Sequence, residues 1–320
     1  MKTQTKPKVL ITNTVPPSVL EPLAGLADVI MGPNTGDLMT REEVLRLAPE
    51  ITAIINQAEL RVDAGLLDVA KELKIVVNVA LGTDNLDLPL MTSRGVWAAN
   101  APGTFVESTA DCTFALLLAV TRRLVEADAY VRSGAWKSFQ PGIWDGMELH
   151  GKTLGIVGFG KIGRAVARRA EGFGLRVLFF DPSAKDDPRF RELDELLPAS
   201  NIVSLHIPLL PETHHIMNSL RFARMKAGGI FINMARGKTM DEAALVSALQ
   251  SGHLAGAGLD VFEDEPVVHP ALPTMKNVVL TPHIGGGTRE SREATRRLAC
   301  ENVAAVLQGR EPVSPVNRLP

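Results

Sequence analysis

The chain has 320 residues, which is enough for two domains of ordinary size. Its 45% hydrophobic and 22% charged residues are typical of a globular protein, and a formal net charge of -2 provides no basic surplus to attract nucleic acid or an anionic membrane. The longest apolar run, residues 114–120, is too short to span a bilayer, and the basic segment 1–13 contains only the apolar run 9–11, too short for a signal peptide. The two cysteines, Cys112 and Cys300, lie among apolar neighbours, so we expect a cytoplasmic protein without disulfides.

Short β-branched runs alternate with helical patterns along the chain, which predicts a doubly wound α/β protein. Pro102-Gly103 interrupts this alternation and is typical of a hinge. In the first hundred residues we expect strands at 8–12, 53–55, 74–78 and 96–99, with helices at 63–71 and 88–94.

A long helix is expected from Thr104 to Arg123. Thr104 is a good N-cap, and Glu107, three residues later, would complete a capping box. The segment is apolar on nearly every face, which indicates burial on several sides. Two arrangements provide such burial: a subunit interface, which the pattern favours, or a central helix within a monomer.

The second half of the chain repeats the alternation of strands and helices. A last helix is predicted from Thr288 to Gln308, and Gly309 fits the glycine that follows a helix C-terminus. The expected strands are 153–157, 176–180, 202–205, 230–233, 257–259 and 278–280.

Gly158, Gly160 and Gly163 form a G-x-G-x-x-G motif between the strand 153–157 and a helical pattern at 164–173. In a dinucleotide-binding loop these glycines provide a tight turn, a close backbone approach to the pyrophosphate and close helix–strand packing. The helix N-terminus adds unpaired N–H groups and a positive dipole end. Because the strand and the helix flank the motif as required, we predict a dinucleotide site.

Asp181 ends the next strand, 23 residues after Gly158, where the ribose-binding acid of such a site is expected. Its carboxylate would accept hydrogen bonds from the ribose hydroxyls and repel a 2′-phosphate, so NAD is favoured over NADP. Asp181 could instead cap a turn with Pro182, and the nearby Lys185 and Arg189 leave NADP open.

Three later segments place ionisable groups just after predicted strands, where open α/β sheets carry their sites. These groups are Arg236, Glu265 and His283. Singly, they could be a surface ion-pair partner, a solvated loop charge and a packing residue. Together they supply what the reduction of a keto acid requires: a carboxylate ligand, a proton donor that titrates near neutrality and a carboxylate that holds this donor charged.

With these motifs in place, the sequence resembles the D-isomer-specific 2-hydroxyacid dehydrogenase family, and within it the glyoxylate/hydroxypyruvate reductase and 2-ketogluconate reductase group. The similarity covers nearly the whole chain. The matching segments are 108–111, 132–136, 158–163, 205–213, 235–242, 257–266 and 281–286.

The resemblance implies reduction of a small 2-keto acid to the D-2-hydroxy acid by hydride transfer from NADH, with Arg236 holding the substrate carboxylate. His283 would be the general acid and Glu265 its partner. Backbone N–H groups of Leu81 and Gly82 would also bind the carboxylate. The reductase group often has valine where Leu81 stands, which affects the expected pocket size.

The resemblance also implies where the cofactor binds. Met234, Ala235 and Asp260 would lie beside the nicotinamide, and residues 206–213 on the adenosine and phosphate side, although His206 has a structural role as an equal alternative. No metal is expected, since His214 and His215 match no metal-ligand spacing and are expected to be exposed. The implied cofactor residues are Thr109, Gly158, Gly160, Lys161, Ile162, Gly163, Asp181, His206, Pro208, Thr213, Met234, Ala235, Asp260, Gly285 and Gly286.

Two doubly wound parallel-sheet domains are implied: a Rossmann-type cofactor domain, 101–286, and a discontinuous flavodoxin-like substrate domain, 1–100 plus 287–320. Hinges are expected near Pro102 and residues 285–287. The resemblance further implies a homodimer in which an aromatic side chain, Trp144 rather than Trp136, reaches the partner's substrate. Two other activities stay open: a non-enzymatic NAD-sensing protein on the same scaffold, and a phosphoglycerate-dehydrogenase-like enzyme.

Overall fold

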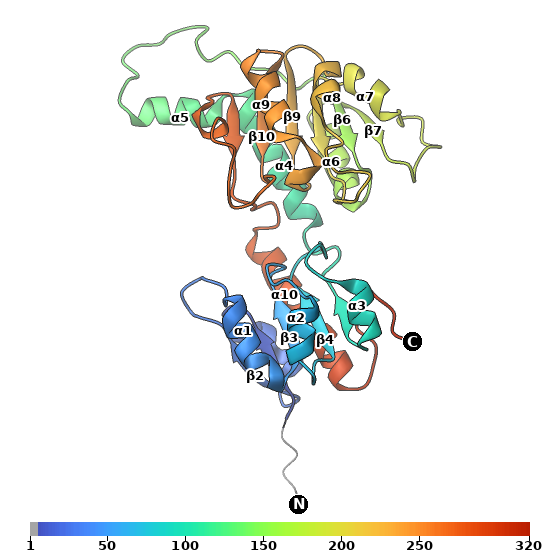
Figure 1. Ribbon diagram of the computed structural model, residues 1–320. Coiled ribbons are helices and arrows are strands. Elements are labelled where there is room, and N and C mark those ends of the chain that lie inside the picture. The colour runs from blue at the N-terminus through green and yellow to red at the C-terminus, as the bar shows by residue number, and fades with distance from the viewer. Residues whose placement is uncertain (1–5) are drawn as a thin grey trace, which may run out of the picture. The chain divides into compact units, whose positions relative to one another are not determined.

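A computed structural model describes residues 6–320 (Figure 1); residues 1–5 of the segment considered above as a possible signal peptide lie outside this range. The chain forms two compact units. Unit 1 comprises the chain up to Phe105 together with Thr288–Pro320, and unit 2 comprises Val106–Gly287. Within residues 6–320, none of the helices combines the length and the apolar character that crossing a membrane requires. The cysteines Cys112 and Cys300 are free thiols.

Unit 1 contains a five-stranded parallel sheet. Its strands are β1 (Lys8–Ile11), β2 (Asp28–Met31), β3 (Ile51–Asn56), β4 (Ile75–Asn78) and β5 (Trp97–Ala99). The strand order β2-β1-β3-β4-β5 is that of flavodoxin-like folds. The flavodoxin-like prediction for this part of the chain is therefore confirmed.

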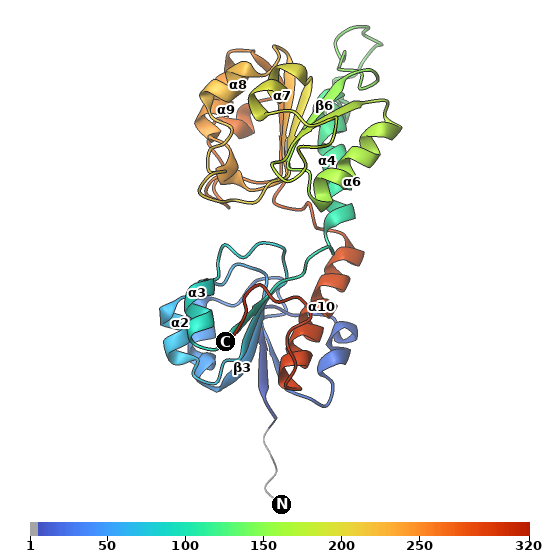
Figure 2. The same cartoon turned by 90° about the vertical axis from the view of Figure 1, so that its right-hand side faces the viewer.

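Helices cover both faces of the unit 1 sheet (Figure 2). One face packs against the long C-terminal helix and a 3-10 segment, through apolar side chains that include Ala299, Cys300 and Val303. The other face packs against three short α-helices and a second 3-10 segment. The elements are η1 (Pro17–Leu23) and α10 (Arg289–Leu307) on the first face, and α1 (Arg41–Leu47), η2 (Ala48–Glu50), α2 (Ala64–Val69) and α3 (Leu88–Ser93) on the second.

The predicted C-terminal helix is confirmed at both ends. Thr288 is the N-cap of α10 and accepts a hydrogen bond from the N–H of Ser291. Gly309 follows the helix with φ = +76° and donates to the carbonyl of Val306. A left-handed residue directly after a helix favours glycine, as the sequence indicated.

Unit 2 contains a six-stranded parallel sheet, whose strands are β6 (Thr153–Val157), β7 (Arg176–Phe180), β8 (Ile202–Leu205), β9 (Gly229–Asn233), β10 (Leu254–Leu259) and β11 (Val278–Leu280). The order is β11-β10-β9-β8-β6-β7, so the direction of winding reverses between β6 and β8. Ligands of open α/β sheets bind at such a switch point, beyond the carboxyl ends of the strands. The Rossmann-type prediction is confirmed.

The helices of unit 2 form a layer on each face of its sheet (Figure 2). One layer consists of α4 (Val106–Thr121) and α6 (Lys161–Gly172). The other consists of α7 (Leu193–Ala199), α8 (Ser219–Arg224) and α9 (Glu242–Gln250). A further helix, α5 (Leu124–Arg132), follows α4, and the short turns η3 (Gly237–Thr239) and η4 (Leu272–Thr274) complete the unit.

The N-terminal cap predicted for α4 is wrong. The helix begins at Val106, and Thr104 Oγ1 donates instead to the carbonyl of Ala101 and accepts from Thr295 Oγ1. Glu107 does not close a capping box with Thr104, because its carboxylate pairs with Arg168 and Arg169 of α6, at 2.8 and 2.9 Å.

The apolar character of α4 is explained by packing within unit 2. The helix contacts α6 on one side and strands β9, β10 and β11 on the other, and ten of its residues are buried. Of the two arrangements that the sequence left open for this helix, the central one accounts for the burial without a partner.

Candidate active site

The glycine loop after β6 has the geometry of a phosphate-binding turn. Gly158 has φ = +96°, and a Cβ atom there would lie 2.6 Å from the carbonyl oxygen of His206, which follows β8. A side chain at Gly163 would collide with the carbonyl of Gly158, whereas Gly160 faces open space. Since Gly160 is also the N-cap of α6, the loop presents a helix N-terminus that a pyrophosphate can approach. These residues therefore fit a dinucleotide.

Asp181, directly after β7, is fixed against this loop. Its Oδ2 accepts the N–H of Phe159 at 2.7 Å, and its Oδ1 accepts the N–H and the hydroxyl of Ser183 at 2.9 and 2.7 Å. Burial by itself raises the pKa of Asp181, but the Ser183 and Phe159 hydrogen bonds and the charge of Arg164 outweigh it and lower the pKa. The predicted ribose ligand is thus a charged carboxylate, and its alternative role as the acceptor of a local turn is also observed.

His206 is neutral. Burial lowers its pKa to about 3, and its Nε2 hydrogen-bonds Ser204 Oγ at 2.8 Å. Its Nδ1 is buried with no hydrogen-bond partner in the described part of the chain. In the same loop, Thr213 Oγ1 donates to the carbonyl of Pro208 and accepts the N–H of Leu210, both at 2.7 Å. A neutral His206 cannot contribute charge to a phosphate, so its contribution is limited to shape and hydrogen bonding.

Arg236 lies in a turn that Asn233, the last residue of β9, organises. The Asn233 side chain accepts the N–H of Ala235 at 3.0 Å and donates to the carbonyl of Arg236 at 3.2 Å. The next residue, Gly237, lies so close to the backbone of Phe262 that it leaves no room for a Cβ atom. Sequence reasoning missed Asn233, although a polar residue ending a buried strand was a visible signal.

His283 and Glu265 form a hydrogen-bonded pair. His283 Nδ1 lies 2.8 Å from Glu265 Oε2, while Glu265 Oε1 accepts the N–H of Phe262 at 3.0 Å. The Glu265 hydrogen bond and charge raise the pKa of His283, against the opposing effects of burial and Arg236. Burial alone would raise the pKa of Glu265, but His283, the Phe262 N–H and Arg236 lower it. The structure thus brings the three predicted groups together, with the histidine biased towards its protonated form.

The loop that carries His283 is held by Asp260, a buried residue after β10. The Asp260 carboxylate accepts hydrogen bonds from Thr281 Oγ1 at 2.6 Å and from the N–H groups of Ile284 and Gly285 at 2.8 and 2.7 Å. The backbone of His283 is left-handed, with φ = +53°, and its N–H donates to the carbonyl of Asp260. Backbone strain at a functional side chain persists only where its surroundings impose it, and Asp260 supplies that constraint.

Four residues that the resemblance assigns to the cofactor site, two of them beside the nicotinamide, lie around one point of unit 2. A Cβ atom built on Gly285 would lie 2.9 Å from Met234 Cε, 3.0 Å from Asp260 Oδ2 and 3.5 Å from Thr109 Cγ2. Thr109 comes from α4, Met234 follows β9 and Asp260 follows β10. Segments far apart in sequence therefore meet beside the loop that carries His283. Gly286 is the next residue of this loop.

A second polar cluster, formed by Glu242, Glu263 and His215, contacts the loop 262–266. Glu242 and Glu263 each accept the other's backbone N–H, at 3.2 and 3.1 Å, and Glu263 also hydrogen-bonds His215 Nε2. Burial and the charge of Glu263 raise the pKa of Glu242. Sequence reasoning missed this cluster. It expected His214 and His215 both to be exposed, which holds for His214, whereas His215 is partly buried and paired.

In unit 1 the predicted substrate loop is anchored by asparagines. Asn78 Nδ2 donates to the carbonyl of Gly82 at 2.9 Å, and Asn100 Nδ2 donates to that of Leu81 at 2.7 Å. Because the C=O and the following N–H of a trans peptide point in opposite directions, anchoring the Leu81 carbonyl also fixes the N–H of Gly82. Leu81 itself is half exposed.

The predicted aromatic residues, Trp136 and Trp144, both lie after α5. The Trp144 ring lies 5.2 Å from that of Tyr130, and the guanidinium of Arg123 lies 5.0 Å from the Trp144 ring. Trp136 is 58% exposed.

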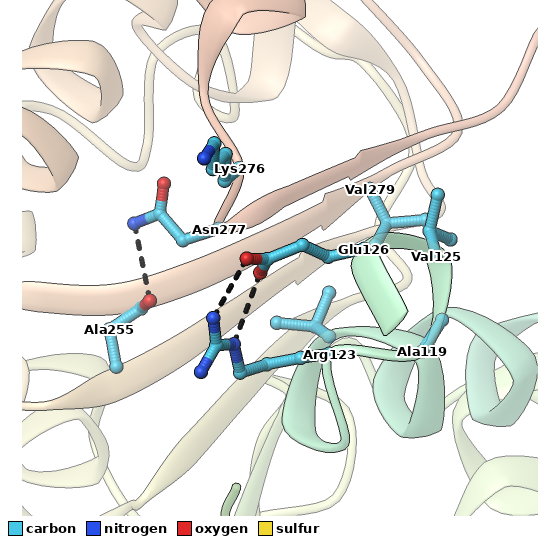
Figure 3. Close-up of a pocket in the computed structure, with 9 residues that line it drawn as sticks. Ala119, Arg123, Val125, Glu126, Ala255, Lys276, Asn277 and Val279 are labelled. Carbon is cyan, nitrogen blue, oxygen red and sulfur yellow. Dashed lines mark hydrogen bonds and ion pairs between the residues drawn. The ribbon is translucent and has the colours of Figure 1, made fainter. Parts of the chain in front are cut away.

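A pocket of about 270 Å³ lies where α4 and α5 meet the sheet of unit 2 (Figure 3). Its walls include the Arg123–Glu126 ion pair and Asn277, which donates to the carbonyl of Ala255. Ala255 stands near the start of β10, and Asn277 precedes β11. The pocket therefore lies at the amino ends of these strands, whereas Glu265 and His283 follow their carboxyl ends, and it is not the site described above.

Comparison with known proteins agrees with this geometry. Residues 114–285 match the family model of the D-isomer specific 2-hydroxyacid dehydrogenase NAD-binding domain. Glyoxylate reductase of Thermococcus onnurineus is 43% identical, and the alignment covers 98% of this chain and 96% of that protein. Glyoxylate reductase of Pyrococcus furiosus is 41% identical, and the alignment covers 98% of this chain and 96% of that protein.

Solved structures give the same result over both units. A protein from Thermus thermophilus is 44% identical, with a TM-score of 0.92 over 97% of this chain and 99% of its own. An NADPH-dependent glyoxylate/hydroxypyruvate reductase from Sinorhizobium meliloti, solved with NADP and malonate, is 32% identical. Its TM-score is 0.84, and the match covers 98% of this chain and 97% of that protein. The chain belongs to the D-isomer-specific 2-hydroxyacid dehydrogenase family, and it is an NAD(P)-dependent oxidoreductase.

Proposed function

We propose that this enzyme reduces glyoxylate or hydroxypyruvate, or a longer 2-keto acid such as 2-ketogluconate, to the D-2-hydroxy acid. The observation that carries the proposal is the pair formed by His283 Nδ1 and Glu265 Oε2 at 2.8 Å, with Arg236 close enough to affect the pKa of both. Similarity to the glyoxylate reductases supports the substrate class.

In this mechanism each side chain has one task. A bound reduced nicotinamide supplies the hydride. Arg236 binds the substrate carboxylate, because its planar guanidinium matches a carboxylate with two parallel hydrogen bonds. Since Nδ1 of His283 is paired with Glu265, its Nε2 is the nitrogen left to protonate the carbonyl oxygen. Glu265 stabilises the imidazolium and fixes the ring.

The substrate loop of unit 1 contributes backbone rather than charge. The N–H groups of Leu81 and Gly82 are proposed ligands of the substrate carboxylate. Their support in the structure is the pair of asparagine anchors, Asn78 and Asn100, which hold the peptide groups of the loop in one orientation.

Cofactor binding is proposed for the turn at Gly158, Gly160 and Gly163 together with Asp181. The helix N-terminus at Lys161 and Ile162 would face the pyrophosphate, and Asp181 would accept a ribose hydroxyl. Because its carboxylate is charged, NADH is the preferred cofactor in this proposal. His206, Pro208 and Thr213 remain proposed neighbours of the adenosine and phosphate side. Ala235 remains a proposed neighbour of the nicotinamide, and Gly285 and Gly286 remain proposed contacts of the cofactor.

A homodimer is also part of the proposal. The helix α5 and the segment after it carry large apolar side chains that are exposed in the single chain, which is typical of a surface that another protein covers. They are Leu124, Val125, Val131, Trp136, Phe139 and Ile143. Trp144, in the same region, stays the proposed aromatic contact with the partner's substrate.

The free thiols Cys112 and Cys300 fit a reducing, cytoplasmic compartment.

The direct test follows the oxidation of NADH and of NADPH with glyoxylate, hydroxypyruvate, pyruvate, 2-ketogluconate and phosphohydroxypyruvate in parallel. We expect turnover with glyoxylate or hydroxypyruvate, and faster with NADH. Selective use of phosphohydroxypyruvate would replace the proposal with a phosphoglycerate-dehydrogenase-like activity. Tight NADH binding without turnover of any acid would favour the NAD-sensing alternative. Light scattering of the same sample tests the dimer.

A further inference from the structure

The chain after α10 returns to the sheet of unit 1 and covers its edge strand β5. We call residues 313–317 the return segment. Within it, Val316 donates its N–H to the carbonyl of Ala98 at 2.8 Å. The Asn317 side chain accepts the N–H of Ala98 at 2.8 Å and donates to the carbonyl of Val96 at 3.0 Å. The polar groups that an edge strand leaves unpaired are therefore bonded to the return segment.

Ser314 of the return segment joins α10 to Asn100, the residue that follows β5. Its Oγ donates to the carbonyl of Asn100 at 2.6 Å. Its N–H donates to Asn302 Oδ1 at 2.9 Å, and Asn302 Nδ2 donates back to Ser314 Oγ at 3.0 Å. Asn302 lies on α10, is fully buried and also donates to the carbonyl of Leu298 at 2.8 Å. The helix thus fixes Ser314, and Ser314 fixes the backbone of Asn100.

Residues 100 and 101 hold both peptide groups that are proposed to bind the substrate carboxylate. Asn100 Nδ2 donates to the carbonyl of Leu81 at 2.7 Å, and the N–H of Ala101 donates to the carbonyl of Ala80 at 2.9 Å. In a trans peptide the N–H points away from the C=O. The N–H groups of Leu81 and Gly82 therefore both point away from residues 100 and 101, and their direction depends on where these two residues lie.

A second connection reaches the same two residues from α10. Thr295, which is fully buried, hydrogen-bonds Thr104 Oγ1 through its own Oγ1 at 2.7 Å. Thr104 Oγ1 in turn donates to the carbonyl of Ala101 at 3.2 Å. Thr295 and Asn302 lie about two turns apart on α10, so one rigid helix holds the short segment 100–101 at two points.

We propose that Asn302 and Ser314 are positioning residues for the keto acid, because they hold Asn100 where it aims the N–H of Gly82 at the substrate carboxylate. The inference rests on the proposed function, which assigns the carboxylate to the loop of Leu81 and Gly82. Asn302 and Ser314 act on the place of the anion, whereas the proposed proton donor lies in unit 2. Their loss should therefore weaken binding of the keto acid and leave kcat near that of the wild type.

The test compares steady-state kinetics of Ser314→Ala and the wild type, with the keto acid that the wild type reduces best. Removing the hydroxyl frees the Asn100 carbonyl, and KM should rise roughly two- to tenfold, the effect of about one hydrogen bond. The kcat, and the Kd of NADH from fluorescence titration, should stay near their wild-type values. Ser314→Thr keeps the hydroxyl and should restore KM.

Asn317→Ala is the matched control, because it alters the same segment. It removes the hydrogen bonds to Ala98 and Val96 but none to residues 100 and 101. Its KM should equal that of the wild type even where denaturant titration shows a lower free energy of unfolding. An unchanged KM in Ser314→Ala, or an equal rise in Asn317→Ala, overturns the inference, since the return segment would then only stabilise the fold.

A double-mutant cycle tests the route through Asn100. In Asn100→Ala the side-chain anchor of Leu81 is already absent, so adding Ser314→Ala should raise KM much less than it does in the wild type. Fully independent effects would contradict the route. If Ser314→Ala does not fold, Ser314→Cys, whose thiol is a weaker donor, must still raise KM, and an unchanged KM there counts against the proposal.

The two levels of the argument fail in different ways. A wild type that reduces keto acids, together with a Ser314→Ala variant of unchanged KM, refutes only this inference. A wild type that binds NADH but reduces none of the keto acids refutes the proposed function itself.

Discussion

The two parallel sheets differ in the charged side chains that follow their strands. In unit 1, β3 and β4 end in Asn56 and Asn78, which are buried and bonded to each other at 3.0 Å, and Asn78 continues to Asn85 at 2.7 Å. In unit 2, the segments after the strands carry Asp181, Asp260, Arg236, Glu265 and His283. Neutral amides can fix a loop but cannot move a proton, so changes in unit 1 should affect binding and stability, and changes in unit 2 should affect turnover.

The largest effect is expected at His283. His283→Ala removes the proposed general acid and should lower kcat by about 10²–10⁴-fold while NADH affinity, measured by fluorescence titration, changes little. His214→Ala, an exposed loop histidine, is the control and should retain full activity. Full turnover in His283→Ala would remove the basis for placing the chemistry in unit 2.

A smaller effect of a different kind is expected at Asn78. Asn78→Ala leaves the amide donor of Asn56 without its acceptor and frees the Gly82 carbonyl. The free energy of unfolding should fall by about 1–3 kcal/mol, because a buried polar group becomes unsatisfied. The KM for the keto acid should rise while kcat stays near that of the wild type. Denaturant titration and steady-state kinetics measure both, and exposed Asn34→Ala is the control. A loss confined to kcat would contradict the expectation that changes in unit 1 affect binding and stability.

A smaller effect is expected at Glu263, because it holds the loop that it shares with Glu265. Glu263→Gln weakens the hydrogen bonds to the Glu242 N–H and to His215, so kcat should fall by roughly two- to twelvefold, the equivalent of about 0.5–1.5 kcal/mol. Asp264→Asn, at the exposed neighbouring position, should have no effect. Equal kinetics for the two variants would leave Glu263 with no influence on Glu265.

The smallest effect is expected at Leu81. Leu81→Val shortens a half-exposed side chain by one methylene, worth at most about 0.8 kcal/mol, or roughly fourfold. The ratio of kcat/KM for hydroxypyruvate to that for glyoxylate should rise within this limit, because the pocket becomes wider. An unchanged ratio would mean that the side chain of Leu81 does not border the substrate.

Much of the cofactor unit was predictable because its signals are local. The strands 153–157, 176–180, 202–205 and 278–280 are short apolar runs that end at glycine or polar residues, and the structure has the same bounds. The edge strand β2 was missed because its apolar run covers only residues 29–31, and none of the four residues Asp28–Met31 is buried in the structure. The helix α1 was missed although Thr40 and Glu43 form the capping box that sequence reasoning wrongly assigned to Thr104.

The parts of the site that escaped prediction depend on partners distant in sequence. Arg236, Glu265 and His283 each follow a strand, so their common edge could be inferred. Other contacts join segments whose spacing in the sequence does not indicate that they meet. They are the reciprocal hydrogen bonds of Glu242 and Glu263, the hydrogen bonds of Asp260 to residues 281–285, and the packing of Arg164 and Arg189 against the Phe159 ring. Only the folded chain shows these contacts.

In the proposed mechanism, Glu265 holds His283 protonated for catalysis. The most direct measurement is the pH dependence of kcat/KM for glyoxylate reduction in the wild type and in Glu265→Gln. Reduction needs the imidazolium, so activity should fall as the pH rises through the pKa of His283, which Glu265 raises above its ordinary value. Removing the carboxylate lowers that pKa, so the falling limb should move to lower pH in Glu265→Gln. Falling limbs at the same pH in the two proteins would contradict it.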